Sequence, residues 1–223
     1  MDIINEPLFK ITLSIVFALT LLKTPVIGTY ISVINTLFHE VGHAVVSILT
    51  FGKVEKIELF SNTEGAAWSS SRFFIGRLLT SLAGYPAASA TALLFLFLIS
   101  KNNFLYIFII ISFVLLFSLI FWIRNIYGLF WSTSSLALLY GLIVYGNPLF
   151  IEIVLMIITS ILLVQSILSS WDILNLSFKT PTEAGDATSL WKSTLIIPPQ
   201  VWGILFFVQS LFFTGLGIKL FIS

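Results

Sequence analysis

The residues best suited to chemistry are His39, Glu40 and His43, which form the pattern His-Glu-x-x-His inside an apolar segment. On a helix, this spacing places both imidazoles one turn apart on the same face, where two nitrogens reach one zinc ion and the glutamate polarises water beside it. The chain holds only these two histidines. Ionisable groups inside an apolar span are costly and usually functional. The pattern therefore predicts a site for one Zn²⁺, with His39 and His43 as ligands and Glu40 as catalytic base; histidines satisfied only by neighbouring helices are the alternative.

The composition is that of a membrane protein. The chain has 223 residues, of which 58% are hydrophobic and 9% charged, and its mean hydropathy is +1.06. Soluble domains carry about 25% charged residues. Apolar runs of about 20 residues recur, and lipid forces such segments to be helical. We expect an all-α polytopic membrane protein in contact with the lipid bilayer. A net charge of +1 without a basic patch argues against a nucleic-acid partner, and the absence of cysteine excludes thiolate sites.

The elements that must position the motif can be predicted from apolar runs and breakers. We expect six to seven transmembrane helices in a single integral-membrane metallopeptidase-like domain over residues 1–223, with no cleavable leader. A short β-hairpin is predicted after the second span, because Val54, Ile57 and Leu59 fit an extended segment and "SNTEG" is typical of a turn. The predicted spans are 8–23, 29–51, 73–99, 104–122, 127–145, 149–174 and 200–221.

Lysine and arginine placement orients the predicted bundle. With the N-terminus in the cytoplasm and alternating spans, eight cations fall inside and three outside, which favours a multi-pass protein of the plasma (inner) membrane with its active site toward the cytoplasm. The inside set is Lys10, Lys53, Lys56, Arg72, Arg77, Arg124, Lys179 and Lys192, and the outside set is Lys23, Lys101 and Lys219.

A catalytic zinc needs a third protein ligand, and the chain offers no further histidine. In the alternating topology the second and sixth spans run in the same direction. His43 lies about 12 Å of helix rise before the end of its span, and Asp172 lies near the end of the sixth. Asp172 is therefore the predicted third ligand. Asp186 remains the alternative ligand, although its setting is more typical of the N-cap of a short interfacial helix.

Three other polar residues have structural as well as functional interpretations. Glu152 complements the dipole in the first turn of the sixth span and is expected to be structural. Asn35, one turn before His39, either supports a ligand imidazole or packs between helices. Asn175 either orients Asp172 or binds a substrate carbonyl, and for both asparagines the structural interpretation is favoured.

Three segments together resemble the short single-domain branch of the site-2 protease family of intramembrane metalloproteases. They are "HEVGHAVVSILTFGKVEKIEL", "SLAGYPAASATALL" and "SSWDILNL…GDATSLW", and the similarity spans most of residues 35–205. The resemblance implies that His39, His43 and Asp172 bind zinc, that Glu40 is the general base, and that a transmembrane helix of a membrane-protein substrate is cleaved near the cytoplasmic face. It also implies that the hairpin pairs with the unwound substrate. One departure is that Asp172 is followed by Ile173, whereas the family often has Asp-Gly.

The sequence thus supports two functions of different classes. One is zinc-dependent hydrolysis of peptide bonds in membrane-protein substrates. The other is a non-proteolytic membrane protein that retains the zinc site for structure or regulation. Neither the substrate nor the oligomeric state follows from the sequence.

Overall fold

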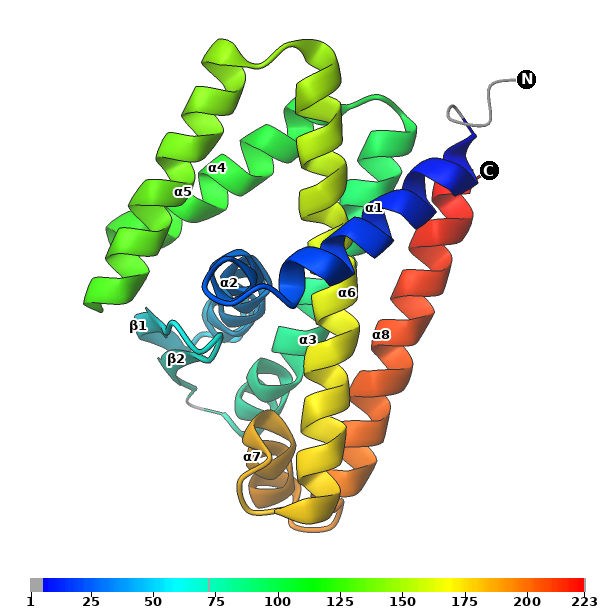
Figure 1. The fold of residues 1–223 in the computed structure, drawn as a ribbon. Helices are drawn as coiled ribbons and strands as arrows, with labels where there is room; N and C mark the ends of the chain where they lie inside the picture. Colours follow the sequence, from blue (N-terminus) through cyan, green and yellow to red (C-terminus); the bar gives the residue numbers. More distant parts are fainter. Residues whose placement is uncertain (1–5, 72, 223) are drawn as a thin grey trace.

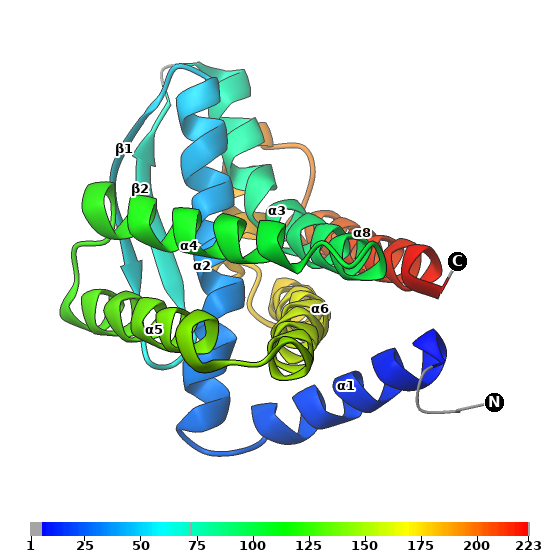
Figure 2. The ribbon, with the colours of Figure 1, turned by 90° about the horizontal axis from the view of Figure 1, so that it is seen from above.

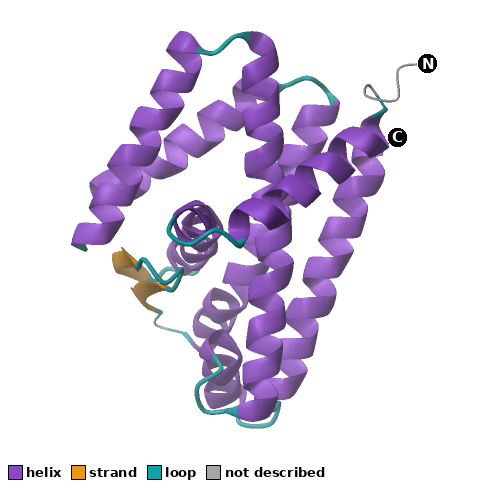
Figure 3. Cartoon of the chain, in the orientation of Figure 1, coloured by secondary structure: helices purple, strands orange, loops and turns teal. Residues whose placement is uncertain are grey.

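The computed structural model describes residues 6–71 and 73–222, which form helices apart from one two-stranded hairpin (Figures 1 and 3). This confirms the predicted helical class and the hairpin after the second span. The elements are α1 (Pro7–Leu22), α2 (Ile27–Leu49), β1 (Lys53–Leu59), β2 (Gly65–Ser70), α3 (Phe74–Ser100), α4 (Phe104–Phe121), α5 (Ile126–Tyr145), α6 (Pro148–Lys179), α7 (Gly185–Thr194) and α8 (Pro199–Ile222).

Six helices in the described part of the chain are long and apolar enough to cross a membrane, namely α2, α3, α4, α5, α6 and α8. The remaining apolar helix, α1, has 16 residues and is shorter than a usual span. Large apolar side chains such as Phe113 and Leu138 are more than 60% exposed, as contact with lipid requires. The chain is an integral, multi-pass membrane protein.

The core lies between α2, α3 and α6. Val33 and Leu37 of α2, Phe95 and Leu96 of α3 and Leu162 of α6 are fully buried and belong to one apolar cluster. Figure 1 looks along α2, whereas α6 and α8 run up the view, and Figure 2 shows the same crossing from above. The second and sixth spans therefore cross each other. The prediction of Asp172 as a ligand had assumed that these two spans run side by side, with His43 and Asp172 at a similar depth.

Two hydrogen bonds mark where α2 and α6 cross. Gln165 donates to Ser32 over 2.5 Å, and the amide of Asn35 donates to Ser169 over 3.5 Å. Beyond this point α6 continues to Lys179, five residues past the predicted end. Asp172 lies on this part of α6, about one helical turn after Ser169.

The hairpin is antiparallel, and one of its edges is covered. The backbone N–H of Ile57 in β1 donates to Trp122 O over 2.7 Å, and the N–H of Arg124 donates to Ile57 O over 3.2 Å. These bonds pin β1 to the connection between α4 and α5. Ala67 of β2 lies opposite Ile57, and since both backbone groups of Ile57 bond away from β2, the two residues form a non-hydrogen-bonded pair. The backbone groups of Ala67, and of Gly65 two residues earlier, therefore face away from β1.

An ion pair joins the beginnings of α1 and α6. Lys10 Nζ lies 3.2 Å from Glu152 Oε1. Figures 1 and 2 also show the first turn of α1 near the last turn of α8. The alternating topology had placed Lys10 and Glu152 on opposite sides of the membrane. Because the two side chains are in contact, the predicted side is wrong for one of them. The expected structural role of Glu152 agrees with the pairing. Arg72, one of the cations assigned to the inside, lies outside the described residues.

Candidate metal centre

The motif lies on α2, as its spacing predicts. His39 and His43 direct their Nε2 atoms toward the same point, and these atoms are 3.0 Å apart. The His39 side chain is 15% exposed and that of His43 is 9% exposed. Both imidazoles are therefore held away from solvent on one face of α2.

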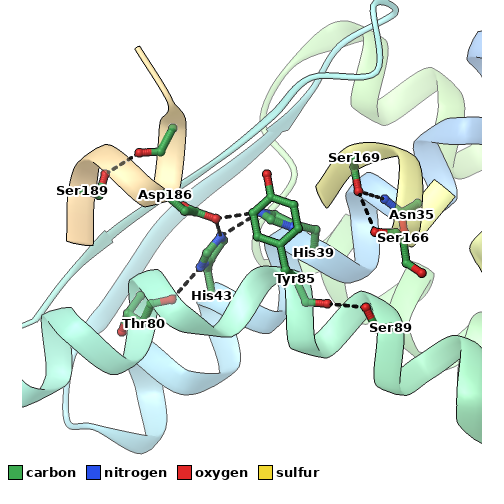
Figure 4. A network of polar contacts seen from close by, with 11 residues as sticks. Asn35, His39, His43, Thr80, Tyr85, Ser89, Ser166, Ser169, Asp186 and Ser189 are labelled. Carbon is green, nitrogen blue, oxygen red and sulfur yellow. Dashed lines mark hydrogen bonds and ion pairs between the residues drawn. The ribbon is translucent and has the colours of Figure 1, made fainter. Parts of the chain in front are cut away.

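Asp186 completes the group. Its Oδ2 lies 3.1 Å from His39 Nε2 and 3.2 Å from His43 Nε2, as Figure 4 shows. The residue stands in the first turn of α7, whose N-cap is Ala184, so Asp186 is not the cap that its sequence context suggested. Gly185 has a φ of +41°, a conformation that favours glycine, and it starts the helix so that the next side chain faces α2.

Asp172, the predicted third ligand, is not part of this group; the structure brings the alternative, Asp186, to the two histidines instead. On α6, Ser169, Ile173 and Leu176 line the cavity at the histidines, whereas Asp172 lies exposed beside this face. The cause is the fold of the following segment. The chain turns back after α6, and α7 packs its buried Ala187 and Leu190 into a cluster with Tyr85 of α3 and Trp202 of α8, which brings Asp186 to the histidines.

A backbone carbonyl fixes the orientation of His43. Thr80 O of α3 lies 2.6 Å from His43 Nδ1, and a carbonyl only accepts hydrogen bonds, so Nδ1 carries the proton and donates. When the ring is neutral, the lone pair of Nε2 is then free. Hydrogen bonds of this kind orient metal-binding histidines in known sites. No sequence signal predicts this contact, because any residue type supplies a carbonyl.

The three donor atoms fit a zinc ion. With its lone pair exposed, His43 Nε2 faces a carboxylate oxygen at 3.2 Å, and two acceptors at this distance need a proton or a cation between them. Ligand atoms bound at 2.0–2.1 Å around a tetrahedral zinc stand about 3.3 Å apart. The observed separations of 3.0, 3.1 and 3.2 Å are close to this value. Two imidazoles and one carboxylate are a donor set that zinc prefers.

The charge balance at Asp186 agrees with a cation site. Burial alone raises the pKa of the Asp186 carboxyl, but positive charge at the imidazoles of His43 and His39 and hydrogen bonds from them lower it more, and the net pKa lies well below its usual range. Asp186 is therefore ionised and available as a ligand at neutral pH.

Glu40 lies on the hairpin side of the three donors. It is 5% exposed and its carboxylate accepts a hydrogen bond from the backbone of Ala67 in β2. A side chain added at Gly65 would stand 2.6 Å from Glu40 Oε1, so the start of β2 must be glycine for the carboxylate to fit. The base predicted from the motif is thus held between the metal-binding face of α2 and the strand.

The backbone of α3 approaches the imidazoles at Gly84. A Cβ atom at this position would stand 2.5 Å from His43 Nε2 and would also overlap the His39 ring. The small residues of "LAGYPAASA" therefore permit the close packing of α3 against α2. The next residue, Tyr85, reaches across His39, and the two ring centroids are 4.6 Å apart in an edge-to-face arrangement.

These residues border a cavity of about 650 Å³ whose wall is formed by α2, β2, α3, α6 and α7. Glu40, Tyr85, Asp186 and both histidines line it, and so do Gly65 and Ala67 of β2. Asn35 lines it as well; it is 6% exposed and its Oδ1 accepts no hydrogen bond from the described residues. Asn175 is not among the lining residues. The cavity is large enough for several residues of an extended peptide.

Comparisons with known proteins place this site in a family. A family model described as peptidase M50B-like matches residues 12–217, which include every residue of the site. Neither curated proteins nor solved structures gave a match to the chain.

Proposed function

Since the chain belongs to the peptidase M50B-like family, which is the site-2 protease family, we propose that it is a zinc-dependent intramembrane endopeptidase acting on membrane-protein substrates. The observation that carries the proposal is the convergence of His39, His43 and Asp186 beside Glu40, in a cavity bordered by the outer edge of β2. We also propose that residues 1–223 form a single domain, because the apolar cluster joins side chains from α1 to α8.

His39, His43 and Asp186 would hold the ion. A bound zinc polarises a carbonyl and makes water nucleophilic near neutral pH. Glu40 takes a proton from the attacking water as the water oxygen bonds to the scissile carbonyl carbon. Glu40 then gives that proton to the amide nitrogen while the carbon–nitrogen bond breaks, which leaves a carboxylic acid and an amine. The second proton of the water passes from the acid to the amine, so the final products are a carboxylate and an ammonium group. The burial of Glu40 against β2 keeps its carboxylate close to the reacting water.

The substrate must be extended at the cleavage point, because the carbonyls of a helix are occupied by its own hydrogen bonds. Gly65 offers its outward-facing backbone groups along the wall of the cavity, and Ala67 offers its carbonyl, because the Ala67 N–H already donates to Glu40. An unwound segment can add to this edge as a third strand, a common mode of peptide recognition. Pairing with β2 lays the segment along the strand that holds Glu40, so a carbonyl of the substrate comes next to the base.

We place the cavity toward the cytoplasm. This placement is supported by the lysines and arginines of the segments that border the cavity or contact the hairpin, namely Lys53, Lys56, Arg124, Lys179 and Lys192. The ion pair between Lys10 and Glu152 leads us to place the start of α1 on the opposite side, together with the start of α6.

Glu40→Gln tests the proposal. The amide keeps the shape of the side chain but does not accept the water proton, so hydrolysis should fall by a factor of about 10² or more, as for general bases in other enzymes. Bound zinc and thermal stability should remain. Glu55→Gln is the matched control, because Glu55 lies exposed on β1. Cleavage is read by mass spectrometry of peptides with an apolar segment, using the purified full chain. Cleavage by Glu40→Gln at the wild-type rate would contradict the proposal and favour a non-proteolytic role for the zinc.

A further inference from the structure

We propose that Tyr85 is a second catalytic residue, whose hydroxyl donates a hydrogen bond to the oxygen of the scissile carbonyl as that oxygen gains negative charge. The inference rests on the proposed function, because it concerns the same peptide hydrolysis. Tyr85 lies outside the His-Glu-x-x-His motif, and membership of the family gives it no role.

The ring of Tyr85 is held firmly beside the metal-binding group. It meets His39 edge to face, with ring planes at 85°, and on its other side it packs against Phe206 of α8 at 4.5 Å between centroids. The residue is 8% exposed. Figure 4 shows the ring rising from α3 in front of His39, with the hydroxyl at the end far from the helix. Such packing fixes the direction in which the hydroxyl points.

The hydroxyl of Tyr85 has no hydrogen-bond partner within residues 6–71 and 73–222, although the residue lines the cavity. Buried tyrosines usually satisfy this group. Tyr30, on the same molecule, does so, because its hydroxyl lies 2.7 Å from Ser134 Oγ. A donor that is kept without a protein partner at the wall of a cavity is available for a ligand in that cavity.

Tyr85 and Glu40 approach the reaction centre from different sides. Glu40 contacts β2, whereas Tyr85 packs toward α8, and Figures 1 and 2 both place the hairpin and α8 on opposite sides of α2 and α3. A scissile carbonyl that lies between them has the base on the side of the attacking water. Its oxygen is then on the side of the phenol.

This arrangement suits the change in charge during hydrolysis. When water adds to the carbonyl carbon, the electron pair of the carbon–oxygen double bond moves to oxygen, and it returns when the carbon–nitrogen bond breaks. Tyr85 keeps its proton throughout and only donates a hydrogen bond. Donors fixed at the position where such charge develops accelerate acyl transfer, and removing one costs about 10²- to 10³-fold in kcat.

Tyr85→Phe separates this role from packing, because phenylalanine keeps the ring against His39 and Phe206 and removes only the hydroxyl. The matched control is Tyr30→Phe, which removes a bonded hydroxyl outside this cavity. Both proteins are prepared as the zinc-loaded full chain. The probes are a peptide that the wild-type protein cleaves and its phosphinic analogue, in which a tetrahedral –PO₂–CH₂– group replaces the scissile amide.

We expect Tyr85→Phe to lower kcat about 10²-fold while KM changes less than about two-fold, because the bond forms mainly in the transition state. Affinity for the phosphinic analogue, measured by calorimetry, should fall by a similar factor, while zinc content stays at the wild-type level. Tyr30→Phe should change neither kcat nor affinity for the analogue.

Equal affinity of wild type and Tyr85→Phe for the analogue would overturn the assignment, and so would an unchanged kcat. A loss of zinc in Tyr85→Phe would also overturn it, because the hydroxyl would then support the metal site instead of the substrate. If wild type cleaves no peptide, the proposed function fails. In that case, the affinities of the wild-type protein and of Tyr85→Phe for a phosphinic peptide of Leu and Ala still decide whether the Tyr85 hydroxyl binds a tetrahedral oxyanion.

Discussion

At the scale of single residues, the site depends on how close three side chains from two helices, α2 and α7, come to one point. His39 and His43 are set by their spacing on α2, but the third donor is set by tertiary structure. Asp186 reaches Nε2 of both histidines at 3.1 and 3.2 Å because α7 folds back against α3 and α8. The same folding leaves Asp172 exposed on α6.

Gly84 gives a prediction at this scale. In Gly84→Ala the new methyl group would overlap the His39 ring and stand 2.5 Å from His43 Nε2, so at least one imidazole must move. We expect zinc affinity to fall about ten-fold or more, at least as much as when an outer-shell partner is lost, while the helix itself is not weakened, since alanine favours helices more than glycine. Equilibrium titration with a zinc chelator measures the affinity.

The control for this change is Gly215→Ala on α8, where an added Cβ meets no atom within 4 Å. It should leave zinc affinity unchanged. Wild-type zinc affinity in Gly84→Ala would show that the imidazoles are not confined by α3, against the packing described for the site.

Residue patterns alone predicted half of the site. His-Glu-x-x-His is a local pattern whose geometry follows from 3.6 residues per turn, so the roles proposed for His39, Glu40 and His43 need no tertiary information. The position of the third ligand depends on contacts between segments that are far apart in the sequence. Equal depth on two parallel spans favoured Asp172, but α2 and α6 cross, so depth along one helix says little about proximity to the other.

At the scale of elements, the hairpin has two different edges. β1 is bonded to the connection between α4 and α5, and the outward backbone groups of Gly65 and Ala67 in β2 border the cavity. The hairpin itself was predictable, because Val54, Ile57 and Leu59 precede a turn sequence. Which of its edges stays free was not, because the covering segment lies more than sixty residues away.

Strand addition to β2 predicts a period of two in substrate binding. N-methylation removes one backbone donor at a time, and in an added strand only alternate donors face β2. We expect N-methyl groups at every second residue near the cleaved bond to weaken binding about 2- to 10-fold each, the usual value of one hydrogen bond. The intervening positions should tolerate methylation.

Binding is measured by fluorescence anisotropy with the Glu40→Gln protein, so that the peptides stay intact. A loss of affinity that follows side-chain size, with no alternation along the peptide, would argue against pairing with the strand.

At the scale of the whole molecule, the spans were predictable and their mutual angles were not. Runs of about 20 apolar residues mark the six helices of the described residues that are long and apolar enough to cross a membrane, because lipid permits little else. The crossing of α2 over α6 and the return of α7 depend on side-chain packing between distant segments, such as the contact of Tyr85 with Phe206.

The proposed orientation can be tested with single cysteines, because the native chain contains none. Asn62→Cys lies in the exposed turn of the hairpin and Asn102→Cys in the exposed connection between α3 and α4. A membrane-impermeant maleimide added to intact cells should label Asn102→Cys, and should label Asn62→Cys only after permeabilisation. The reverse pattern would place the metal centre on the outer side.

The zinc content of two aspartate variants decides whether α2 and α7 together form the metal centre. Asp186→Asn and Asp172→Asn are isosteric changes of the two candidate ligands, and zinc is measured by elemental analysis of the purified full chain. We expect one zinc per chain in wild type and in Asp172→Asn. We expect Asp186→Asn to lose its zinc, because an amide is a poor zinc ligand. Retention of zinc by Asp186→Asn together with its loss from Asp172→Asn would contradict the account.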